Sequence, residues 1–551
     1  MSILERIISV VSPEWAVNRA SARATLQQID SFLGTNSGYA SGKIDRLNGG
    51  KRVQHLKENQ IAPDNIQNAK SKAWQAWRDN PYARKIVRAI EAKVIGPAMV
   101  PESLATNPDG SPNTEFRKSC KTLWQSIEAG FDVRGMPGQG GQTMPGLQRL
   151  ALRACVLSGN VLYRLVPIDP GEAMRRDIPV PLAIQLIDVA RLSDDVPAGQ
   201  VADGHMVHRG IEFDANGTRV AYWINDAAGT PVSHSASELR HLFVEDDIDQ
   251  VLGVTWFAPS TLSMKDANDL QYNVIKSTAM AACVAMGIRK PSGKTRFGLQ
   301  SSVENGAGTA DGTDLTDVDG NAISRMSPGM IVNLGETGDL QSFSPNQPNI
   351  NPEGFVQHML RGVSAGMPGV KSSTIIGDYR QSSFSSEKSA DNDIWPEVTA
   401  LQDWFASGFC QPIYEAVVKA AVLSGYFGER FPVAEFNASP GRYLSAKWQG
   451  PVAQSINPEK DAGAAAARMQ HGLSSPQMEC ARINVNWIDV LNDVADFYST
   501  AASKGIPEEV VNNIFSVDTQ DVTEALPASP DPMPAPKPTT PKKKAASAKA
   551  K

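Results

Sequence analysis

A long stretch without helix-breaking residues places the strongest constraint on how this chain can fold. Residues 259–286 contain no Gly or Pro between their ends and are rich in Ala, Leu, Met, Lys and Asp. These residue types are compatible with one continuous helix. At 1.5 Å per residue that helix spans roughly 40 Å. The fold therefore has to accommodate a single rod of that length.

The segments that follow alternate between exposed and helical character. Residues 301–325 are polar and rich in Gly and Asp, which predicts a loop or an exposed insert, and an apolar strand is expected at residues 329–334. Residues 351–365 predict a second helix. After the polar stretch 377–386, apolar residues at helical spacing predict a long helix over residues 394–424. The expected order is helix, insert, helix, polar loop and long helix.

The first half of the chain predicts helices followed by a β region. Helices are expected over residues 13–35 and 65–95. Asn80-Pro81 is a helix-start pair, and Gly96-Pro97 ends the helix because Pro cannot continue its hydrogen-bond ladder. Runs of strand-forming residues, separated by turn residues, predict a mainly antiparallel β domain. These strands are expected at residues 161–166, 182–187, 210–213, 219–224 and 239–244, with an Asn216-Gly217 turn. Residues 459–505 again predict helices.

The length and composition exclude several classes of protein. A chain of 551 residues exceeds what one core usually supports, so several sub-domains or one elongated body are expected, and 41% hydrophobic residues argue against wholesale disorder. No apolar run is long enough for a membrane span. Residues 1–15 carry Glu5 and Arg6 inside their apolar stretch and lack the pattern of a secretory signal. We therefore expect synthesis in the cytosol and no membrane partner.

The cysteines indicate neither a disulfide framework nor a zinc cluster. The five are dispersed, odd in number and never in a CxxC pair, so buried free thiols are expected. They are Cys120, Cys155, Cys283, Cys410 and Cys480.

Charge is distributed unevenly along the chain. The formal net charge is −6, yet residues 526–551 hold six Lys against Asp531 and carry +5, so the remainder carries −11. A body this acidic is a poor static binder of DNA, because affinity for DNA comes largely from cations that neutralise phosphates. A DNA partner would slide past it. The Pro-rich, then Lys-rich tail is expected to be disordered in isolation.

Three motifs resemble sites of known chemistry, and each fits a simpler interpretation better. Residues 287–295, GIRKPSGKT, end like a phosphate-binding loop, but five residues separate the two glycines where that loop needs four. We also expect this segment to follow a helix and not a strand. Residues 315–320, LTDVDG, resemble a calcium loop, yet the first and twelfth ligand positions lack side-chain oxygens. His205 and His208 have metal spacing on a helix, but the glycines around them suggest strand or turn. We therefore predict no catalytic residue, no cofactor and no metal site.

Several short motifs, in a fixed order, resemble the portal proteins of lambda-like tailed bacteriophages. Individually each is weak, but the ordered set is specific and runs over roughly residues 15–505. The motifs are RDNPYAR at 78–84, VIG at 94–96, LAIQLID at 182–188, GIEFD at 210–214, AY at 221–222, HLF at 241–243, GVTWFAP at 253–259, SPGMI at 327–331, Tyr379 with Ser385-Ser386, and FCQPIYE at 409–415.

The resemblance implies an α+β portal fold with a wing, a stem of paired helices, a clip and an α-helical crown, assembling as a ring. The corresponding domains are an N-terminal arm and wing (1–258), a stem helix (259–288), the clip (289–343), a second stem helix (344–366), a tunnel-loop region (367–390), a long helix with the wing return (391–455), the crown (456–520) and a disordered Pro/Lys-rich tail (521–551).

The resemblance also suggests where DNA would be contacted. Residues 377–386 fall at the tunnel loop, whose hydroxyls, amide and single Arg suit weak, replaceable phosphate contacts; an ordinary helix connector is the alternative. The candidate loop residues are Tyr379, Arg380, Gln381, Ser382 and Ser383. Lys265 and Lys276 are candidates to face the channel from the stem helix. Tail candidates, which either clamp phosphates or simply solubilise the segment, are Lys542, Lys543 and Lys544.

By this resemblance the protein is not an enzyme but a ring-forming subunit, expected as a dodecamer, at one vertex of the capsid. It is expected to conduct double-stranded DNA during packaging and ejection without reading its sequence. Its expected partners are the terminase large subunit, head–tail connector or adaptor proteins, and the major capsid and scaffold proteins. Its location would be the virion, and the host cytoplasm during assembly. Two alternatives remain: an ATP-using packaging motor, and a capsid-wall or neck protein that does not gate DNA.

Overall fold

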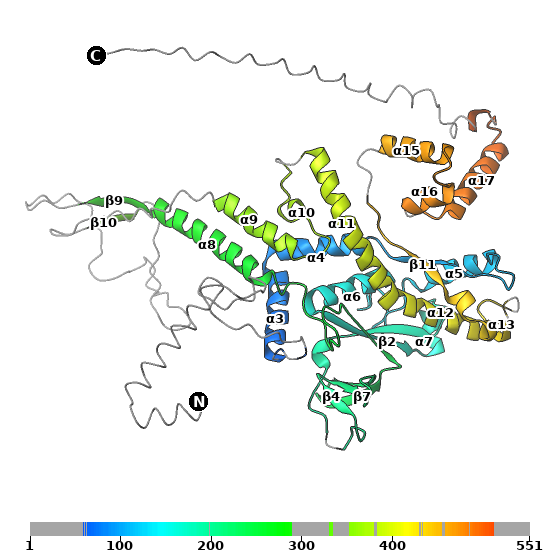
Figure 1. Cartoon of the computed structure of the whole chain (residues 1–551), viewed down its shortest axis with the longest axis horizontal. Coiled ribbons are helices and arrows are strands. Elements are labelled where there is room, and N and C mark those ends of the chain that lie inside the picture. Colours follow the sequence, from blue (N-terminus) through cyan, green and yellow to red (C-terminus); the bar gives the residue numbers. More distant parts are fainter. Residues whose placement is uncertain are drawn as a thin grey trace, which may run out of the picture. The chain divides into compact units, whose positions relative to one another are not determined.

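The computed structural model consists of helices and short sheets (Figure 1). It describes residues 59, 61, 63–197, 199–288, 330–333, 352–379, 383–428, 431, 433–453, 458–483, 485–507 and 509–511. The expectations for residues 13–35, for most of the clip and for the Lys-rich tail lie outside these residues. The chain divides into two units at Ile61, and nearly all described residues belong to the second, Ala62–Lys551. No helix of the described part is both long and apolar enough to cross a bilayer.

Two consecutive helices, α3 (Pro63–Asp79) and α4 (Pro81–Val94), begin the described part. Asn80 lies between them, and its side-chain oxygen accepts hydrogen bonds from two backbone N–H groups in the first turn of α4. This is a standard helix cap, and a Pro at the first helical position needs no N–H there. The helix start expected at Asn80-Pro81 is confirmed. The buried residues of α4 are Ala83, Ile86, Val87, Ile90, Glu91 and Val94.

Two antiparallel sheets form the β region, as expected. The first has the order β3-β2-β8 and the second the order β4-β5-β6-β7, and every pairing in them is antiparallel. Their bounds are β2 (Asn160–Pro167), β3 (Leu182–Ile187), β4 (Met206–His208), β5 (Ile211–Phe213), β6 (Arg219–Asn225), β7 (Pro231–Ser235) and β8 (Leu239–Phe243). All five expected strands are present, and the short strands β4 and β7 are additional.

The hairpin turn between β5 and β6 forms where Asn216-Gly217 predicts it. The carboxylate of Asp214 accepts hydrogen bonds from the backbone N–H groups of Asn216 and Thr218, and Gly217 adopts φ +81°. Only Gly enters this left-handed region without a steric cost. The turn therefore needs both its Asp and its Gly.

An antiparallel helix pair follows the sheets. α8 (Thr261–Cys283) packs along α9 (Pro352–Ala365) (Figure 1). Ser260, just before α8, donates its hydroxyl hydrogen bond to Val363 O near the end of α9, so the two helices run in opposite directions. Beyond α8, β9 (Val284–Ile288) pairs in parallel with β10 (Met330–Asn333). The strand expected near residues 329–334 is thus confirmed.

The strand β9 corrects two expectations. The helix expected to reach residue 286 ends at Cys283, because pairing with β10 overrides the local helix preference of the next residues. Gly287 and Ile288, which begin the segment 287–295, therefore belong to a strand and not to the end of a helix. A phosphate-binding loop also begins after a strand, so the expectation that this segment directly follows a helix was wrong. The five-residue spacing between its glycines still departs from the loop's pattern.

One helical rod spans residues 384–423. α11 (Phe384–Phe405) continues through a π-helical segment (Ala406–Cys410) into α12 (Gln411–Leu423). The expected long helix is confirmed, but it begins at Phe384 and not at residue 394. The earlier start has a local cause: Ser383 and Ser386 cap each other reciprocally, which satisfies backbone N–H groups of the first turn.

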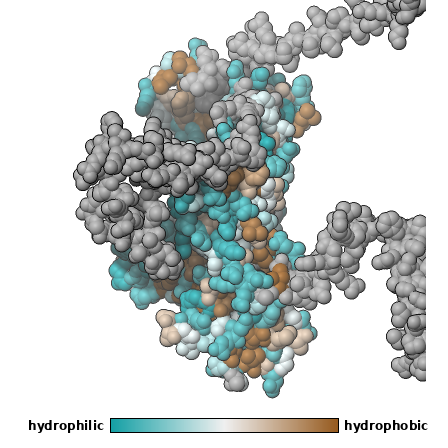
Figure 2. Space-filling model, turned by 90° about the vertical axis from the view of Figure 1, so that its left-hand side faces the viewer, coloured by the Kyte–Doolittle hydropathy of each residue, from teal (hydrophilic) through white to brown (hydrophobic). Residues whose placement is uncertain are grey.

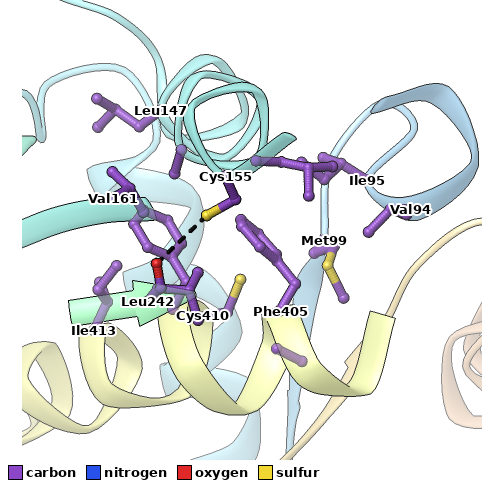
Figure 3. Packing of buried hydrophobic residues seen from close by; sticks show 14 of the residues in the cluster. Val94, Ile95, Met99, Leu147, Cys155, Val161, Leu242, Phe405, Cys410 and Ile413 are labelled. Carbon is purple, nitrogen blue, oxygen red and sulfur yellow. Dashed lines mark hydrogen bonds between the residues drawn. The ribbon is translucent and has the colours of Figure 1, made fainter. Parts of the chain in front are cut away.

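The main core lies where this rod crosses the three-stranded sheet (Figure 3). Tyr163 on β2 donates a 2.6 Å hydrogen bond to Gly408 O in the π-helical segment. Figure 3 shows Cys155, from the helix before β2, pointing toward Leu242 on β8 and Phe405 on the rod, with Cys155 Sγ 3.6 Å from Leu242 O. The rod is therefore held by apolar packing together with a hydrogen bond from the sheet.

The cysteines of the core are free thiols, as expected. Cys120, Cys155 and Cys410 are buried and unpaired by disulfides. Burial raises the pKa of all three thiols, that of Cys120 to about 11, so they stay protonated near neutral pH. Cys480 is partly exposed, and the side chain of Cys283 lies outside the described residues.

The remaining elements surround this core or follow it. β1 pairs antiparallel with β11, so that Val100 lies opposite Gln449. The helices expected over residues 459–505 are confirmed as α15 to α17. The bounds are β1 (Val100–Ser103), α5 (Thr114–Ile127), α6 (Met144–Ser158), α7 (Pro170–Arg175), a 3₁₀ turn (Val189–Arg191), α10 (Ser372–Ile376), α13 (Val433–Ala438), α14 (Gly441–Leu444), β11 (Ala446–Gln449), α15 (Pro458–Gln470), α16 (Pro476–Arg482) and α17 (Trp487–Ser503).

Two glycines allow a test of close backbone packing. Both Gly159, at the end of α6, and Gly217 have φ near +80°, but a Cβ on Gly159 would lie 2.6 Å from backbone atoms of Gly253, whereas one on Gly217 would meet nothing within 4 Å. We expect Gly217→Ala to lower the free energy of unfolding by about 1 kcal/mol and Gly159→Ala by about 3 kcal/mol or more, since overpacking adds to the same backbone cost. Guanidinium unfolding measures both, and equal losses would contradict the close approach.

Candidate functional site

The residues expected to form the tunnel loop lie between α10 and the first turn of α11. Gly377 ends α10 in the left-handed conformation, with φ +71°, and Ser383 caps α11 by accepting a hydrogen bond from the N–H of Ser386. Ser385 and Ser386 are therefore helical, and the polar stretch 377–386 ends inside α11. Tyr379 is 55% exposed. Residues 380–382, which carry three of the candidate side chains, lie outside the described residues.

A partly buried ion-pair cluster braces the base of this loop. The ammonium group of Lys371, just before α10, lies 2.8 Å from Glu387 Oε2 and 2.8 Å from Asp391 Oδ1. The two carboxylates are one helical turn apart on α11 and so present a common face. Ser373 donates a further hydrogen bond to Glu387 at 3.2 Å. The start of α11 is thereby tied to the segment on the other side of the loop.

Lys371 remains charged in this cluster. Its side chain is only 12% exposed, and this burial lowers its pKa. The hydrogen bonds to Asp391 and Glu387 together raise the pKa by more, so that the pKa of Lys371 lies above its ordinary value. A buried ammonium group is tolerated where carboxylates compensate its lost hydration. The brace is therefore an ionic contact at neutral pH.

A second set of contacts fixes the turn before α10 to helix α4. Lys93 donates a 3.0 Å hydrogen bond to Gly369 O, and the N–H of Gly369 donates one to Glu397 Oε2 at 3.0 Å. Burial lowers the pKa of Lys93, with Asp391 acting to raise it and Lys371 to lower it. Three separate segments thus hold the loop base, and no spacing in the sequence indicates that they meet.

The two candidate stem lysines share one exposed side of α8. Lys265 and Lys276 are both exposed and lie eleven residues apart, which on an α-helix leaves them about 20° from alignment. The opposite side of the helix is buried through Met264 and Ala267. Lys276 Nζ also lies 4.6 Å from the ring centroid of Tyr272, a cation–π contact that orients the side chain. The lysines are therefore placed to act together.

A groove between α8 and α9 extends to Ile376 and Asp378, next to the loop base. It has a volume of about 530 Å³. Its walls are mostly apolar, from Leu270 and Val274 on α8 and Val356 and Leu360 on α9, and Asp378 lies at its edge, directly before Tyr379. On the face drawn in Figure 2, hydrophobic patches interrupt the hydrophilic surface. The lining of the groove shows that α8 and α9 present apolar surface close to Asp378.

The two motif histidines lie at the edge strand of the second sheet, His205 directly before β4 and His208 at its end. His205 Nδ1 lies 2.7 Å from Glu212 Oε1, and Trp223 Nε1 donates a 3.0 Å hydrogen bond to Glu212 Oε2. His208 is part of β4, where residue spacing follows a strand. In the part of the chain that the structure describes, no group of three or more His, Cys, Asp and Glu residues could hold a metal ion.

Removing the charge of Lys371 tests the brace. We expect Lys371→Met to lower the free energy of unfolding by about 2 kcal/mol, less than for a fully buried pair because both carboxylates keep some exposure. The amides of residues 384–395 should exchange hydrogen faster, as measured by mass spectrometry. The matched control is Lys388→Met, whose ammonium is exposed on the same helix. Identical exchange in the two variants would show that the brace does not hold the loop.

Comparisons with known proteins show one family and a set of distant solved structures. The profile of the family described as phage portal protein, lambda family, matches residues 44–402. No curated protein matches significantly. Among solved structures, a chain in the neck of an empty GTA particle computed with C6 symmetry is 14% identical, with a TM-score of 0.36, and the match covers 76% of this chain and 94% of that one.

Two further structures are similar at the same level. In the virion of a native gene transfer agent (GTA) particle, a chain is 12% identical, with a TM-score of 0.35 over 76% of this chain and 93% of that one. In the neck of a native GTA particle computed with C12 symmetry, a chain is 13% identical, with a TM-score of 0.35 over 77% of this chain and 94% of that one. The family profile, in contrast, covers more than half of the sequence and includes α8, α9, the loop and most of α11. This chain therefore belongs to the lambda family of phage portal proteins.

Proposed function

We propose that this chain forms a closed ring, expected as a dodecamer, at one vertex of the capsid, and that DNA passes through the ring during packaging and ejection. The observation that carries the proposal is the antiparallel pair α8–α9, with the insert between its helices and the braced loop directly after it, inside the segment that matches the portal family. An outgoing helix, a returning helix and a loop with a fixed base are parts suited to lining a channel.

The domain boundaries implied by the family resemblance are part of this proposal. Both sheets lie within the proposed N-terminal arm and wing, and β1–β11 pairing joins the proposed wing return to that wing. α15, α16 and α17 fall within the proposed crown. The proposed parts are the arm and wing (1–258), stem helices (259–288 and 344–366), clip (289–343), tunnel-loop region (367–390), long helix and wing return (391–455), crown (456–520) and tail (521–551).

The proposed contacts with DNA are weak and do not read sequence. Lys265 and Lys276 share one exposed side of α8, and Tyr379 and Ser383 lie at the two described ends of the loop. Arg380, Gln381 and Ser382 would supply the middle, and the tail lysines 542–544 further phosphate contacts. Because residues outside the tail carry −11, repulsion between this body and phosphates opposes tight binding, and DNA slides.

The proposed partners are other proteins of the particle and of the packaging machinery. We propose that the ring docks the terminase large subunit, the head–tail connector or adaptor proteins, and the capsid and scaffold proteins, and has no catalysis of its own. ATP hydrolysis would belong to the terminase. An ATPase assay on the purified chain distinguishes this proposal from a packaging motor, in which residues 287–295 would bind the nucleotide.

Electron microscopy of the purified protein with its native mass tests the ring directly. We expect closed rings with an axial hole of about 20 Å or more, wide enough for duplex DNA, and a mass of twelve chains. Oligomers without a central hole would favour a capsid-wall or neck protein. A single-chain globule that hydrolyses ATP would overturn the portal proposal.

The loop and the stem lysines can be tested in one DNA-packaging assay. We expect deletion of residues 380–382 to reduce packaged or retained DNA while rings still form, and the deletion leaves Ser383 in place because it caps α11. Lys265→Glu combined with Lys276→Glu should also alter packaging, since it replaces two attractive contacts with repulsive ones. Normal full heads from both variants, with rings of normal mass, would remove the channel role from these residues.

A further inference from the structure

One side of α4 is positively charged, although most of the chain is acidic. Residues 78–88 hold four cations against one acid, Asp79, and so carry +3, whereas all residues outside the tail together carry −11. Arg84, Lys85 and Arg88 are exposed. Successive residues of an α-helix are about 100° apart, so these three side chains fall within about 100° around α4. The chain therefore gathers like charges on one face of a helix.

These charges are not neutralised within the described residues. There, the side chains of Lys85 and Arg88 take part in no hydrogen bond or ion pair. Arg84 donates hydrogen bonds to two backbone oxygens, at 3.3 and 3.4 Å, and carbonyl groups do not cancel the charge of a guanidinium group. Like charges one turn apart destabilise a helix. A partner that brings negative charge would therefore stabilise this face.

Helix α6 extends the same side of the molecule. α3, α4 and α6 pack against one another (Figure 1). Arg153 on α6 donates two hydrogen bonds to the carboxylate of Glu91, at 2.7 and 3.2 Å, and so neutralises it. Positions 84, 88 and 91 lie within about 60° around α4, so Arg153 stands beside the exposed cations. Arg149, one turn before Arg153, donates to two backbone oxygens just after α4, at 3.2 and 3.0 Å.

The aromatic ring beside these cations is already covered. The guanidinium carbons of Arg84 and Arg153 lie 5.4 and 5.1 Å from the centroid of the Trp77 ring. Such cation–π contacts orient both side chains, and Trp77 also packs against the core. Single-stranded nucleic acids are commonly bound by stacking of their bases on open aromatic rings. Trp77 is not an open platform of this kind.

The composition of this face fits a nucleic-acid backbone better than a folded protein. Neither α3 nor α4 exposes a large apolar side chain, whereas protein–protein interfaces have an apolar core. Interfaces with DNA are more polar and much more positively charged. Arg84 and Arg88 are about 6 Å apart along the helix, and the phosphates of each strand recur about every 3.4 Å along the duplex axis. Both side chains can therefore meet phosphates of one strand.

We propose that Arg84, Lys85 and Arg88 on α4, with Arg149 and Arg153 on α6, form a second surface for duplex DNA, the α4–α6 basic surface, which binds phosphates outside the channel. The inference rests on the proposed function, in which α4 and α6 belong to the arm and wing, while α8 and the loop contact DNA in the channel. Contacts with phosphates carry no sequence information, so the surface takes any duplex. The acidic remainder of the body repels DNA and leaves this face as the place of contact.

Closed circular DNA separates this surface from the channel. A relaxed, covalently closed duplex circle has no end and cannot be threaded through a preformed closed ring, so it reports contacts outside the channel. We expect wild-type rings to retain such circles in a filter-binding assay, with an affinity that falls steeply as salt rises. Arg84→Gln combined with Arg88→Gln should reduce the slope of log K against log salt concentration by about 2 in magnitude, because each lost phosphate contact removes about 0.9.

The matched control is Arg240→Gln combined with Arg442→Gln. It removes two arginine charges from exposed positions on β8 and α14 and should leave the slope unchanged. Native mass and circular dichroism check that each variant keeps its rings and its helix content, and Gln is a good helix former. If Arg84→Gln disturbs folding, Lys85→Gln combined with Arg88→Gln decides, because neither side chain has a bonding partner among the described residues.

The outcomes decide this inference separately from the proposed ring. If wild-type rings bind linear duplex but no circles, or if the α4 double variant binds circles like the control, the inference is wrong and the ring proposal stands. If the α4 double variant loses binding of poly-glutamate but not of circles, the surface takes an acidic protein segment and the inference is also wrong. Wild-type protein that never forms rings would overturn the proposed function, and the same comparison of slopes on single chains then decides whether the α4–α6 basic surface binds DNA.

Discussion

The rest of the structure depends on the contact between the helical rod 384–423 and the three-stranded sheet. Tyr163 donates its hydrogen bond to Gly408 in the π-helical segment, and a Cβ on Gly408 would lie 2.4 Å from Leu242 Cδ1, so the rod approaches the sheet as closely as a glycine permits. This fixed rod presents Glu387 and Asp391 to Lys371 at one end. Further along, Gln411 accepts a hydrogen bond from Trp448. The rod therefore positions both the loop base and the distant strand β11.

The helix pair α8–α9 is anchored in the same core. Phe257 and Met264 are buried at the start of α8, and Ser260 binds the end of α9, so the helix pair is rooted at one end and carries exposed lysines and an apolar groove along its length. The helix pair is therefore rooted at one end, and Lys371 ties the start of α11 to the segment before α10. In the proposed DNA channel, a helix pair rooted in this way would hold the contacts along it at a fixed distance from the DNA.

The order of elements could be predicted from the sequence, because it depends on local signals. The cap at Asn80, the turn at Gly217 and the five apolar strands all have such signals. The failures involve partners distant in sequence or patterns with two meanings. β9 is a strand because of its pairing with β10, Ser386 belongs to a capping box although serines are also common in loops, and the brace of Lys371 has no spacing rule. The π-helical segment has no recognisable sequence pattern. Of the candidate site, the position of the loop and the shared side of the stem lysines follow from sequence, but its anchoring does not.

The pairing of β1 with β11 has a consequence for how the subunit is made. Val100 and Gln449 are opposite each other. The strand β1 is synthesised early and therefore stays unpaired until β11 has left the ribosome, after most of the chain. A product terminated before residue 446 keeps β1 without this partner, and an unpaired strand edge invites aggregation or removal by cellular proteases. A truncated chain of this kind therefore differs from the full-length chain by an unpaired β1. In the proposed ring, where each position takes one copy, we expect this late pairing to keep truncated chains out of the assembly.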